Sequence, residues 1–422
     1  MKKLRYWNWS IIATYILPCA IILSPIEMYL GFWWIDTIIK FYAVIVSLCV
    51  FVRGGYLKNN KMSTLVLGYI LYCLITGVSY FWIKQPISCY FADISDFLLP
   101  ILFFYVGLKD INDRLMYDRF LMCLVPIFIL GIICYITTPG WYTIRLAQIM
   151  NSQWYINSDV YDEETVLSVT RFTAFFRTSY PVSHFVIFGL AIAYFDILRS
   201  DKETRYNTLC VMILILVAFL SQHRVAIACM ALFLLFTIYS SVKKRLISRM
   251  LPLFLVLGVG SLSAVIYGLS DDRFQDVYTM VSERVEDMSV SNALKERKQI
   301  HQVMSSWDNI ITGQGIGSGG ATARAAGFYG ITDQNYIKLL YETGVLGCLY
   351  LSLILWLTIL RGVKYYKYYL TEMMIIVFIL IAMLGSNSLV IYYTYTFLFW
   401  YAVGRIWNQA YLQKAIINEI KI

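Results

Sequence analysis

A histidine and an arginine lie between two apolar runs of the chain, with almost no loop around them. His223 and Arg224 separate the predicted membrane spans 207–221 and 225–241, which places Arg224 near the depth of lipid headgroups. A guanidinium can hold phosphate oxygens through two parallel hydrogen bonds. The position therefore suits a lipid-linked phosphate, and the alternative is an arginine that only anchors the protein at the interface.

Two further arginines enclose an aromatic run just before another predicted span. Arg171 and Arg177 flank residues 172–176, and the span 181–198 follows. Positions 171 and 177 do not share a helical face, so we expect a turn here rather than a straight helix. Both arginines are candidates for binding the same phosphate. An interfacial belt of aromatic and basic side chains is the alternative.

Glycines are concentrated near the end of a second long loop. Gly313 and Gly315 belong to the segment 311–320, in which every second residue or so is a glycine. The segment lacks the Gly-Lys-Ser/Thr ending of a nucleotide-binding P-loop, and no strand precedes it. We expect a flexible external turn that contacts substrate.

An acid, an amide and a phenol follow this turn at the start of a further apolar run. Asp333, Gln334 and Tyr336 precede the predicted span 340–360. A carboxylate at the membrane surface could take a proton from a substrate hydroxyl, with His223 as the second candidate for that role. Asp333 could equally be an ordinary helix N-cap.

The composition of the chain determines which elements must position these groups. Of 422 residues, 59% are hydrophobic and 14% are charged, and the mean hydropathy is +0.64. Soluble domains carry about 25% charged residues, so a soluble protein is excluded. The apolar residues form runs of about 20, the length of a membrane-spanning helix. We predict an all-α integral membrane protein with about twelve transmembrane helices. The predicted spans are 8–25, 34–52, 63–83, 92–108, 118–137, 181–198, 207–221, 225–241, 251–268, 340–360, 372–387 and 388–404.

The spans and the breaks between them divide the chain into five parts. Residues 1–137 hold helices one to five, 138–180 form a first long loop, and 181–268 hold helices six to nine. A second long loop occupies 269–339, and 340–422 hold the last three helices and a tail.

Lysines and arginines indicate the orientation of these helices. They gather in the short breaks of one side, as in 53–58, 199–202 and 243–245, and short cytoplasmic loops carry such an excess. We therefore predict that both termini are cytoplasmic and both long loops external, with the first helix uncleaved. The net charge of +9 is interpreted as this topology signal rather than as a nucleic-acid footprint.

The ionisable side chains near the span ends and the cysteines are predicted to have structural rather than functional roles. Five ionisable residues near span ends are expected to snorkel to the surface or cap helices: Glu27, Asp36, Lys40, Asp93 and Asp96. Of nine cysteines, only Cys89 falls in a predicted loop, which argues against a disulfide framework. The scarcity of charges in the middle of the spans and the absence of a visible internal repeat count against a transporter.

Several of these segments together resemble the O-antigen polymerase and ligase superfamily. The resemblance covers about residues 165–360 and rests on the turn 313–317, on 333–347, on the segment 221–226 and on 171–181. Ligases of this superfamily have a histidine at the position of Asp333, whereas polymerases often have Asp-Asn there. The chain is therefore most similar to the Wzy-type polymerases. It differs from them at Gln334, Thr178 and Arg177.

The resemblance implies a fold and a reaction. The fold would be a helical bundle with a cap formed by the two long loops at the periplasmic face, similar to the C-class membrane glycosyltransferases. The activity would be the polymerisation of repeat units linked to undecaprenyl pyrophosphate, in the bacterial inner membrane, without nucleotide sugar, metal or other cofactor. Arg171, Arg177 and Arg224 would bind pyrophosphate, and a chain-length regulator is a candidate partner. An O-antigen ligase is the nearer alternative, and a polysaccharide flippase or transporter is the more distant one.

Overall fold

The computed structural model shows a helical protein. It describes residues 9–31, 34–54, 60–76, 86–110, 114–153, 172–176, 179–199, 205–221, 226, 230, 233, 310–320, 322–323, 327, 335–383 and 393–420. Within these ranges the regular elements are all helices. The fold is thus all-α where it is described, as the sequence predicts.

Helices occupy each predicted span that lies in the described ranges. In the first part of the chain they are α1 (Trp9–Ala13), α2 (Ile16–Leu30), α3 (Trp34–Gly54), α4 (Lys61–Thr76), α6 (Ile87–Asp93), a π-helical turn (Ile94–Leu98), α7 (Leu99–Ile101), α8 (Phe103–Lys109) and α9 (Leu115–Thr137). In the second part they are α12 (Ser179–Arg199), α13 (Arg205–Ser221), α20 (Asn335–Lys364), α21 (Tyr366–Ala382) and α22 (Tyr393–Ile406). The predicted spans 225–241 and 251–268 fall almost wholly outside the described residues.

Among the residues that the structure describes, four helical segments are long and apolar enough to cross a membrane. They are Ile11–Leu30, Ile87–Lys109, Leu115–Thr137 and Asn335–Lys364. Shorter apolar helices cover Thr37–Val52, Lys61–Thr76, Pro181–Ala193 and Tyr206–Ser221. A membrane protein is therefore supported, and the count of about twelve spans stays a prediction.

Two of the described helices lie outside the predicted spans. Helix α10 (Gly140–Gln153) falls in the first predicted long loop, and α23 (Gln409–Ile420) falls in the predicted tail. Both mix apolar and polar residues too evenly to be recognised as a span.

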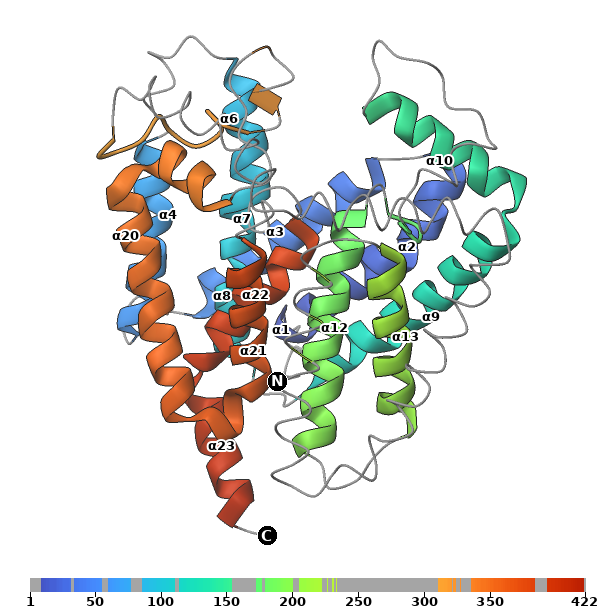
Figure 1. Cartoon of the computed structure of the whole chain (residues 1–422). Helices are drawn as coiled ribbons and strands as arrows, with labels where there is room; N and C mark the ends of the chain where they lie inside the picture. Colours follow the sequence, from blue (N-terminus) through green and yellow to red (C-terminus); the bar gives the residue numbers. More distant parts are fainter. Residues whose placement is uncertain are drawn as a thin grey trace, which may run out of the picture.

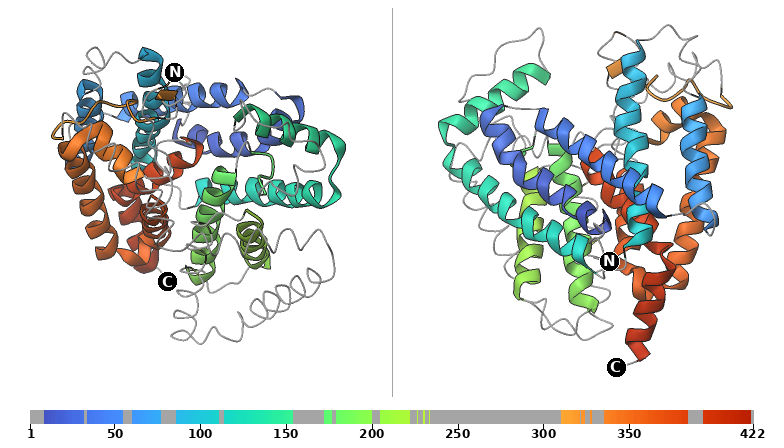
Figure 2. Two further views of the ribbon diagram at one scale, coloured as in Figure 1. Left: turned by 45° about the horizontal axis from the view of Figure 1, so that its top comes forward. Right: turned by 180° about the vertical axis from the view of Figure 1, so that it is seen from behind.

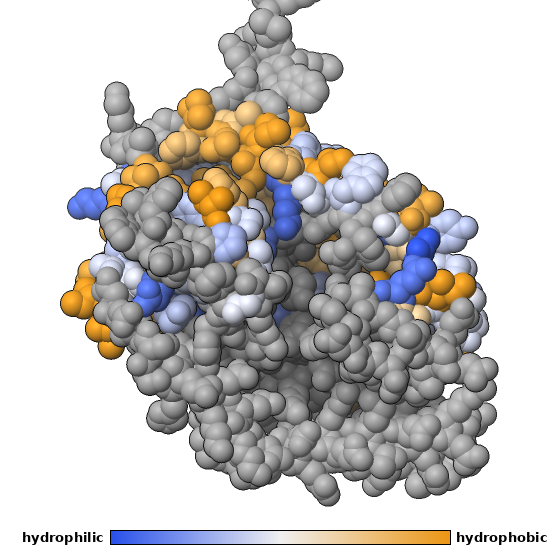
Figure 3. Space-filling view, turned by 90° about the horizontal axis from the view of Figure 1, so that it is seen from above, coloured by the Kyte–Doolittle hydropathy of each residue, from blue (hydrophilic) through white to orange (hydrophobic). Residues whose placement is uncertain are grey.

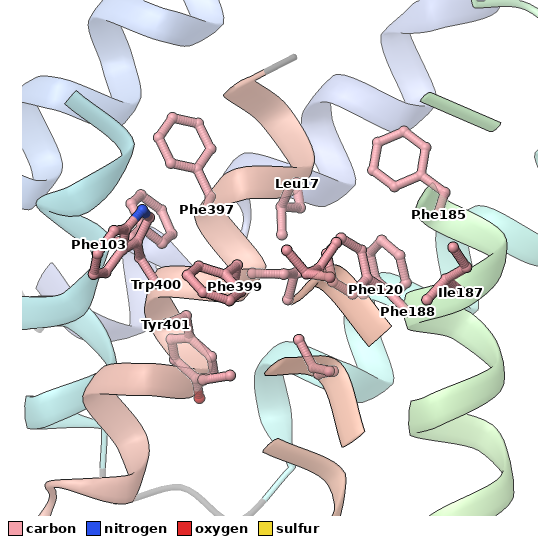
Figure 4. Close-up of a cluster of buried hydrophobic side chains, with 14 of the residues drawn as sticks. Leu17, Phe103, Phe120, Phe185, Ile187, Phe188, Phe397, Phe399, Trp400 and Tyr401 are labelled. Atoms are coloured by element: carbon pink, nitrogen blue, oxygen red, sulfur yellow. The ribbon is translucent and has the colours of Figure 1, made fainter. Parts of the chain in front are cut away.

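Aromatic side chains fill the centre of the bundle between α8, α9, α12 and α22 (Figure 4). Phe103 of α8 stacks on Phe397 of α22 with ring centroids 4.4 Å apart. The two helix backbones approach closely because each presents a glycine to the other: a Cβ on Gly107 would overlap the Tyr401 carbonyl, and one on Gly404 would overlap the Phe104 carbonyl. Small residues are the usual means of such close packing between membrane helices.

The two ends of the bundle differ in what they carry. Helix α10, the start of α6 and the turn 310–320 lie at the end drawn uppermost in Figure 1. The end of α12, the start of α13, the connection between α20 and α21, and α23 lie at the opposite end, as the reverse view confirms (Figure 2). The ends of α9 and α13 and the starts of α12 and α20 thus share one end of the bundle. Seen from above, its described surface shows hydrophilic patches beside apolar ones (Figure 3).

A buried ionic cluster joins the helices near the C-terminal end. Arg405 of α22 is fully buried, and its Nε lies 3.1 Å from Glu372 Oε1 of α21. Its Nη1 lies 3.7 Å from Asp110 Oδ2, which accepts a hydrogen bond from the Tyr401 hydroxyl at 2.7 Å. The Tyr117 hydroxyl of α9 donates to Glu372 at 3.0 Å. These contacts tie α9, α21, α22 and the end of α8 together.

Candidate functional site

Helix α20 is interrupted at Gly344, and the turn 310–320 fills the interruption. Gly344 has φ 67° and ψ −176°, a left-handed backbone that glycine adopts at no steric cost. The break frees carbonyl groups on the N-terminal side. The N–H of Gln314 donates to the Tyr341 carbonyl and the N–H of Gly315 to the Glu342 carbonyl, both at 2.9 Å.

The amides on the other side of the break are satisfied by the same turn. The N–H of Val345 donates to the Ile310 carbonyl at 3.0 Å, and that of Leu346 to the Ile311 carbonyl at 3.1 Å. An unpaired backbone group inside a bilayer costs several kcal/mol, so such breaks persist only where other groups pair with them. The turn and the broken helix therefore complete each other.

The glycines of the turn are needed where it meets its neighbours. Gly313 packs so closely on the backbone at Gly344 that a Cβ on either residue would overlap the other's amide nitrogen. A Cβ on Gly317, whose φ is +89°, would lie 2.5 Å from the Cys89 carbonyl oxygen of α6. Gly313 and residues 315–320 are buried. The predicted turn is therefore enclosed between α6 and α20 rather than exposed, and its external location stays a prediction.

Three buried charged side chains lie directly against this turn. Lys338 Nζ of α20 is 2.7 Å from Asp93 Oδ2 of α6 and 3.6 Å from Glu342 Oε1, one helical turn along α20. The exposed fractions are 4% for Asp93 and 1% for Lys338 and Glu342. Glu342 Oε1 accepts a hydrogen bond from the N–H of Gly319 at 3.1 Å. The ionic cluster thus connects two helices to the backbone of the turn.

A second ion pair continues from this cluster along α6. Asp96, in the π-helical turn after Asp93, lies with Oδ1 3.0 Å from Lys40 Nζ of α3. The prediction that Asp93, Asp96 and Lys40 snorkel or cap helices is therefore wrong. Both carboxylates are instead held by lysines from distant parts of the chain. π-helical turns occur frequently at functional sites.

The end of the first long loop forms a compact turn against α10 and α13. The N–H of Phe172 donates to the Leu220 carbonyl at 3.1 Å, and that of Phe176 to the Thr173 carbonyl at 2.9 Å. The Tyr142 hydroxyl of α10 donates to the carbonyl of Ala174 at 3.0 Å. Burial raises the pKa of Tyr142 above its usual value. The predicted turn between Arg171 and Arg177 is confirmed for residues 172–176.

The structure describes three of the predicted site residues. Gly313 and Gly315 pack against and pair with α20, and Tyr336 lies at the start of α20, where its hydroxyl donates to the Leu380 carbonyl of α21 at 2.8 Å. Six others lie outside the described residues: Arg171, Arg177, His223, Arg224, Asp333 and Gln334. Some of their chain neighbours are placed, however. Phe172 follows Arg171 in the sequence, and Leu220 lies at the end of α13, shortly before Arg224. The backbone hydrogen bond between Phe172 and Leu220 therefore joins the chain next to Arg171 to the helix that precedes Arg224.

Sequence reasoning missed the cluster of Asp93, Lys338 and Glu342. A signal for it was present, since Lys338 and Glu342 stand four residues apart at the start of an apolar run. Ionisable residues within such runs are rare and are typical of functional sites. No group of three or more His, Cys, Asp or Glu side chains that could hold a metal occurs among the residues described.

A family model described as O-Antigen ligase matches residues 209–352. The matched stretch begins in α13 and includes the turn 310–320, Asp333, the ionic residues Lys338 and Glu342, and the break at Gly344. No curated protein matches the chain. The match covers about a third of the chain: this stretch is similar to the O-antigen polymerase and ligase superfamily, which supports a role in the assembly of O-antigen or a related surface polysaccharide.

Proposed function

We propose that this chain polymerises oligosaccharide repeat units linked to undecaprenyl pyrophosphate, at the periplasmic face of the bacterial inner membrane. The growing glycan leaves its pyrophosphate and is joined to the non-reducing end of a single lipid-linked repeat unit. The observation that carries this proposal is the pairing of the turn 310–320 with the broken helix α20. Both segments lie within the matched stretch, and Asp333 stands between them in the sequence.

In the reaction, a hydroxyl of the acceptor sugar attacks the anomeric carbon of the donor glycan. The bond from that carbon to the pyrophosphate oxygen breaks, and the leaving pyrophosphate takes the electron pair. Arg171, Arg177 and Arg224 stabilise the charge that develops there, and this stabilisation is stronger in the transition state than in the ground state. Asp333 accepts the hydroxyl proton, with His223 as the alternative base.

The described residues next to these groups support a shared site. The turn 172–176 and the end of α13 lie at the same end of the bundle as the turn 310–320. The start of α20, which follows Asp333 and Gln334 in the sequence, is tied to α21 by Tyr336. The chain neighbours of the arginines and of Asp333 therefore lie at one end of the bundle.

An O-antigen ligase is the second candidate, since the family model that matches residues 209–352 carries that description. A ligase uses the same donor and transfers the glycan to lipid A core. Asp333 favours the polymerase, because the ligases that the chain resembles have a histidine there.

Deletion of the gene distinguishes the two. Loss of a polymerase leaves lipid A core capped with a single repeat unit, because the ligase still works. Loss of a ligase leaves bare core and accumulated lipid-linked polymer. We expect the single-unit pattern on a gel of the extracted lipopolysaccharide, restored to a ladder by the wild-type gene. Bare core would overturn the polymerase assignment and favour the ligase.

A further inference from the structure

The cluster of Asp93, Lys338 and Glu342 has no part in the reaction as proposed, yet it lies against the glycine turn. Two carboxylates share one ammonium, and all three side chains are almost completely buried. Burying unbalanced charge is expensive, so a cluster that served only to join α6 to α20 would need one carboxylate, not two. The second carboxylate requires another explanation.

The contacts of Glu342 identify what the second carboxylate holds. Asp93 already forms the short ion pair with Lys338 at 2.7 Å, whereas Glu342 lies farther from it at 3.6 Å. Glu342 Oε1 accepts the N–H of Gly319 at 3.1 Å, and its own backbone carbonyl accepts the N–H of Gly315. One residue therefore binds the turn at two points.

The remaining members of the cluster form the wall behind the turn. A Cβ on Gly320 would lie 2.7 Å from Asp93 Oδ1, so the chain at Gly320 rests directly on that carboxylate. Lys338 fixes Asp93 in this position from α20. The turn is thereby fixed at Gly315 and Gly319 by Glu342 and supported at Gly320 by Asp93.

We propose that Glu342, together with Lys338 and Asp93, is a positioning group: by fixing the buried turn 313–320 against α20, it sets the position of Asp333, which follows the turn in the sequence, relative to the acceptor sugar. This rests on the proposed function. Lys338 follows Asp333 on the same stretch of chain, and Asp333 is the group that takes the acceptor's proton. The arginines that hold the donor pyrophosphate belong to other segments, at 171–177 and 224. Glu342 therefore acts on the acceptor side of the reaction and not on the donor side.

The test uses the full-length protein in vesicles of phosphatidylethanolamine and phosphatidylglycerol. The donor is a repeat unit on undecaprenyl pyrophosphate, and the acceptor is the same repeat unit on an alkyl chain without pyrophosphate, which can only accept. Initial rates give a separate KM for each substrate and a kcat. Glu342→Ala leaves the buried amide of Gly319 unpaired, and we expect it to raise the acceptor KM about tenfold with the donor KM unchanged.

Glu342→Gln is the second variant, because it retains an oxygen for the Gly319 amide and leaves Asp93 and Lys338 as a balanced pair. We expect it to fold and to raise the acceptor KM about two- to threefold. The matched control is Glu372→Gln. Glu372 is also a buried carboxylate in a cluster with a second carboxylate and one cation, Asp110 and Arg405. It belongs to the first half of α21, a helix that starts at the opposite end of the bundle (Figure 1). The acceptor KM of Glu372→Gln should equal that of the wild type.

Failure of the positioning role and failure of the proposed function give different results. A wild-type protein that transfers glycan to no acceptor would overturn the proposed function itself. An active wild type whose folded Glu342 variants keep the wild-type acceptor KM would overturn only the positioning role. The positioning role would also be overturned if Glu372→Gln raised the acceptor KM as much as Glu342→Gln does, or if the Glu342 variants lowered kcat without changing either KM.

Discussion

Arg224 is the residue at which phosphate binding and membrane anchoring can be separated. We expect Arg224→Ala to abolish long polymer while the protein is inserted at a normal level. Arg224→Lys should restore little, because an ammonium cannot replace the two parallel hydrogen bonds of a guanidinium. Gel analysis of polymer length together with a blot of membrane protein measures both effects. Normal chain length in Arg224→Ala would leave only the anchoring role.

Asp333 can be tested by a substitution that keeps its capping ability. If Asp333 is the base, Asp333→Asn should slow glycan transfer by about 10²–10⁴-fold, the usual contribution of acid–base catalysis. Asparagine caps a helix nearly as well as aspartate, so a residue that only caps α20 would give a rate close to that of the wild type. Transfer rates at saturating substrate decide between the two roles.

Lys338 balances two buried carboxylates, so its removal should lower the stability of the fold in addition to disturbing the turn that the cluster positions. Lys338→Met leaves Asp93 and Glu342 without their ammonium, and breaking a buried ion pair costs about 3–5 kcal/mol. We expect a large fall in the amount of folded protein, measured by fluorescence size-exclusion chromatography after heating. Lys40→Met is the control, since Lys40 and Asp96 are about a quarter exposed and such pairs contribute less. Equal stability of the two variants would contradict the buried cluster.

At the scale of elements, the fit of the glycine turn against α6 can be probed with one methyl group. Gly320→Ala would place a carbon 2.7 Å from Asp93 Oδ1, whereas Gly140→Ala adds the same carbon with no atom within 4 Å. We expect Gly320→Ala to shorten the polymer and lower transfer by about tenfold or more through displacement of the turn. Gly140→Ala should retain wild-type polymer length. Polymer ladders of the two strains at matched protein levels make the comparison.

The positions of most helices could be predicted from the sequence, but the joint between the turn and α20 could not. Runs of apolar residues identify helices such as α9 and α13 without ambiguity. The break at Gly344 has apolar residues on its C-terminal side, and a glycine there is equally typical of close helix packing. The partner of Lys338 is 245 residues away along the chain. Neither feature leaves a local pattern, whereas the turn at 172–176 does, through Arg171 and Arg177 on different helical faces.

At the scale of the whole molecule, the predicted topology makes a direct prediction. Reporter fusions at positions 150 and 290 should report a periplasmic location, and fusions at 202 and 364 a cytoplasmic one. The physical reason is the gathering of Lys and Arg in the short breaks at one side. Alkaline phosphatase and green fluorescent protein activities measure the two locations. A cytoplasmic long loop would remove the lipid-linked mechanism, because its substrate is presented on the other side.

The hydrogen bonds across the break at Gly344 also determine how this protein can be recombined with its relatives. Residues 310–315 and 341–346 exchange four backbone hydrogen bonds. They therefore form one structural unit, a cassette, although about 25 residues separate them in the sequence. A chimera that imports only a foreign second loop would set a foreign turn against the native break, and any change in the path of that turn would leave amides and carbonyls of α20 unpaired. Exchange of acceptor specificity between such enzymes should therefore succeed only when both crossover points lie outside 310–346.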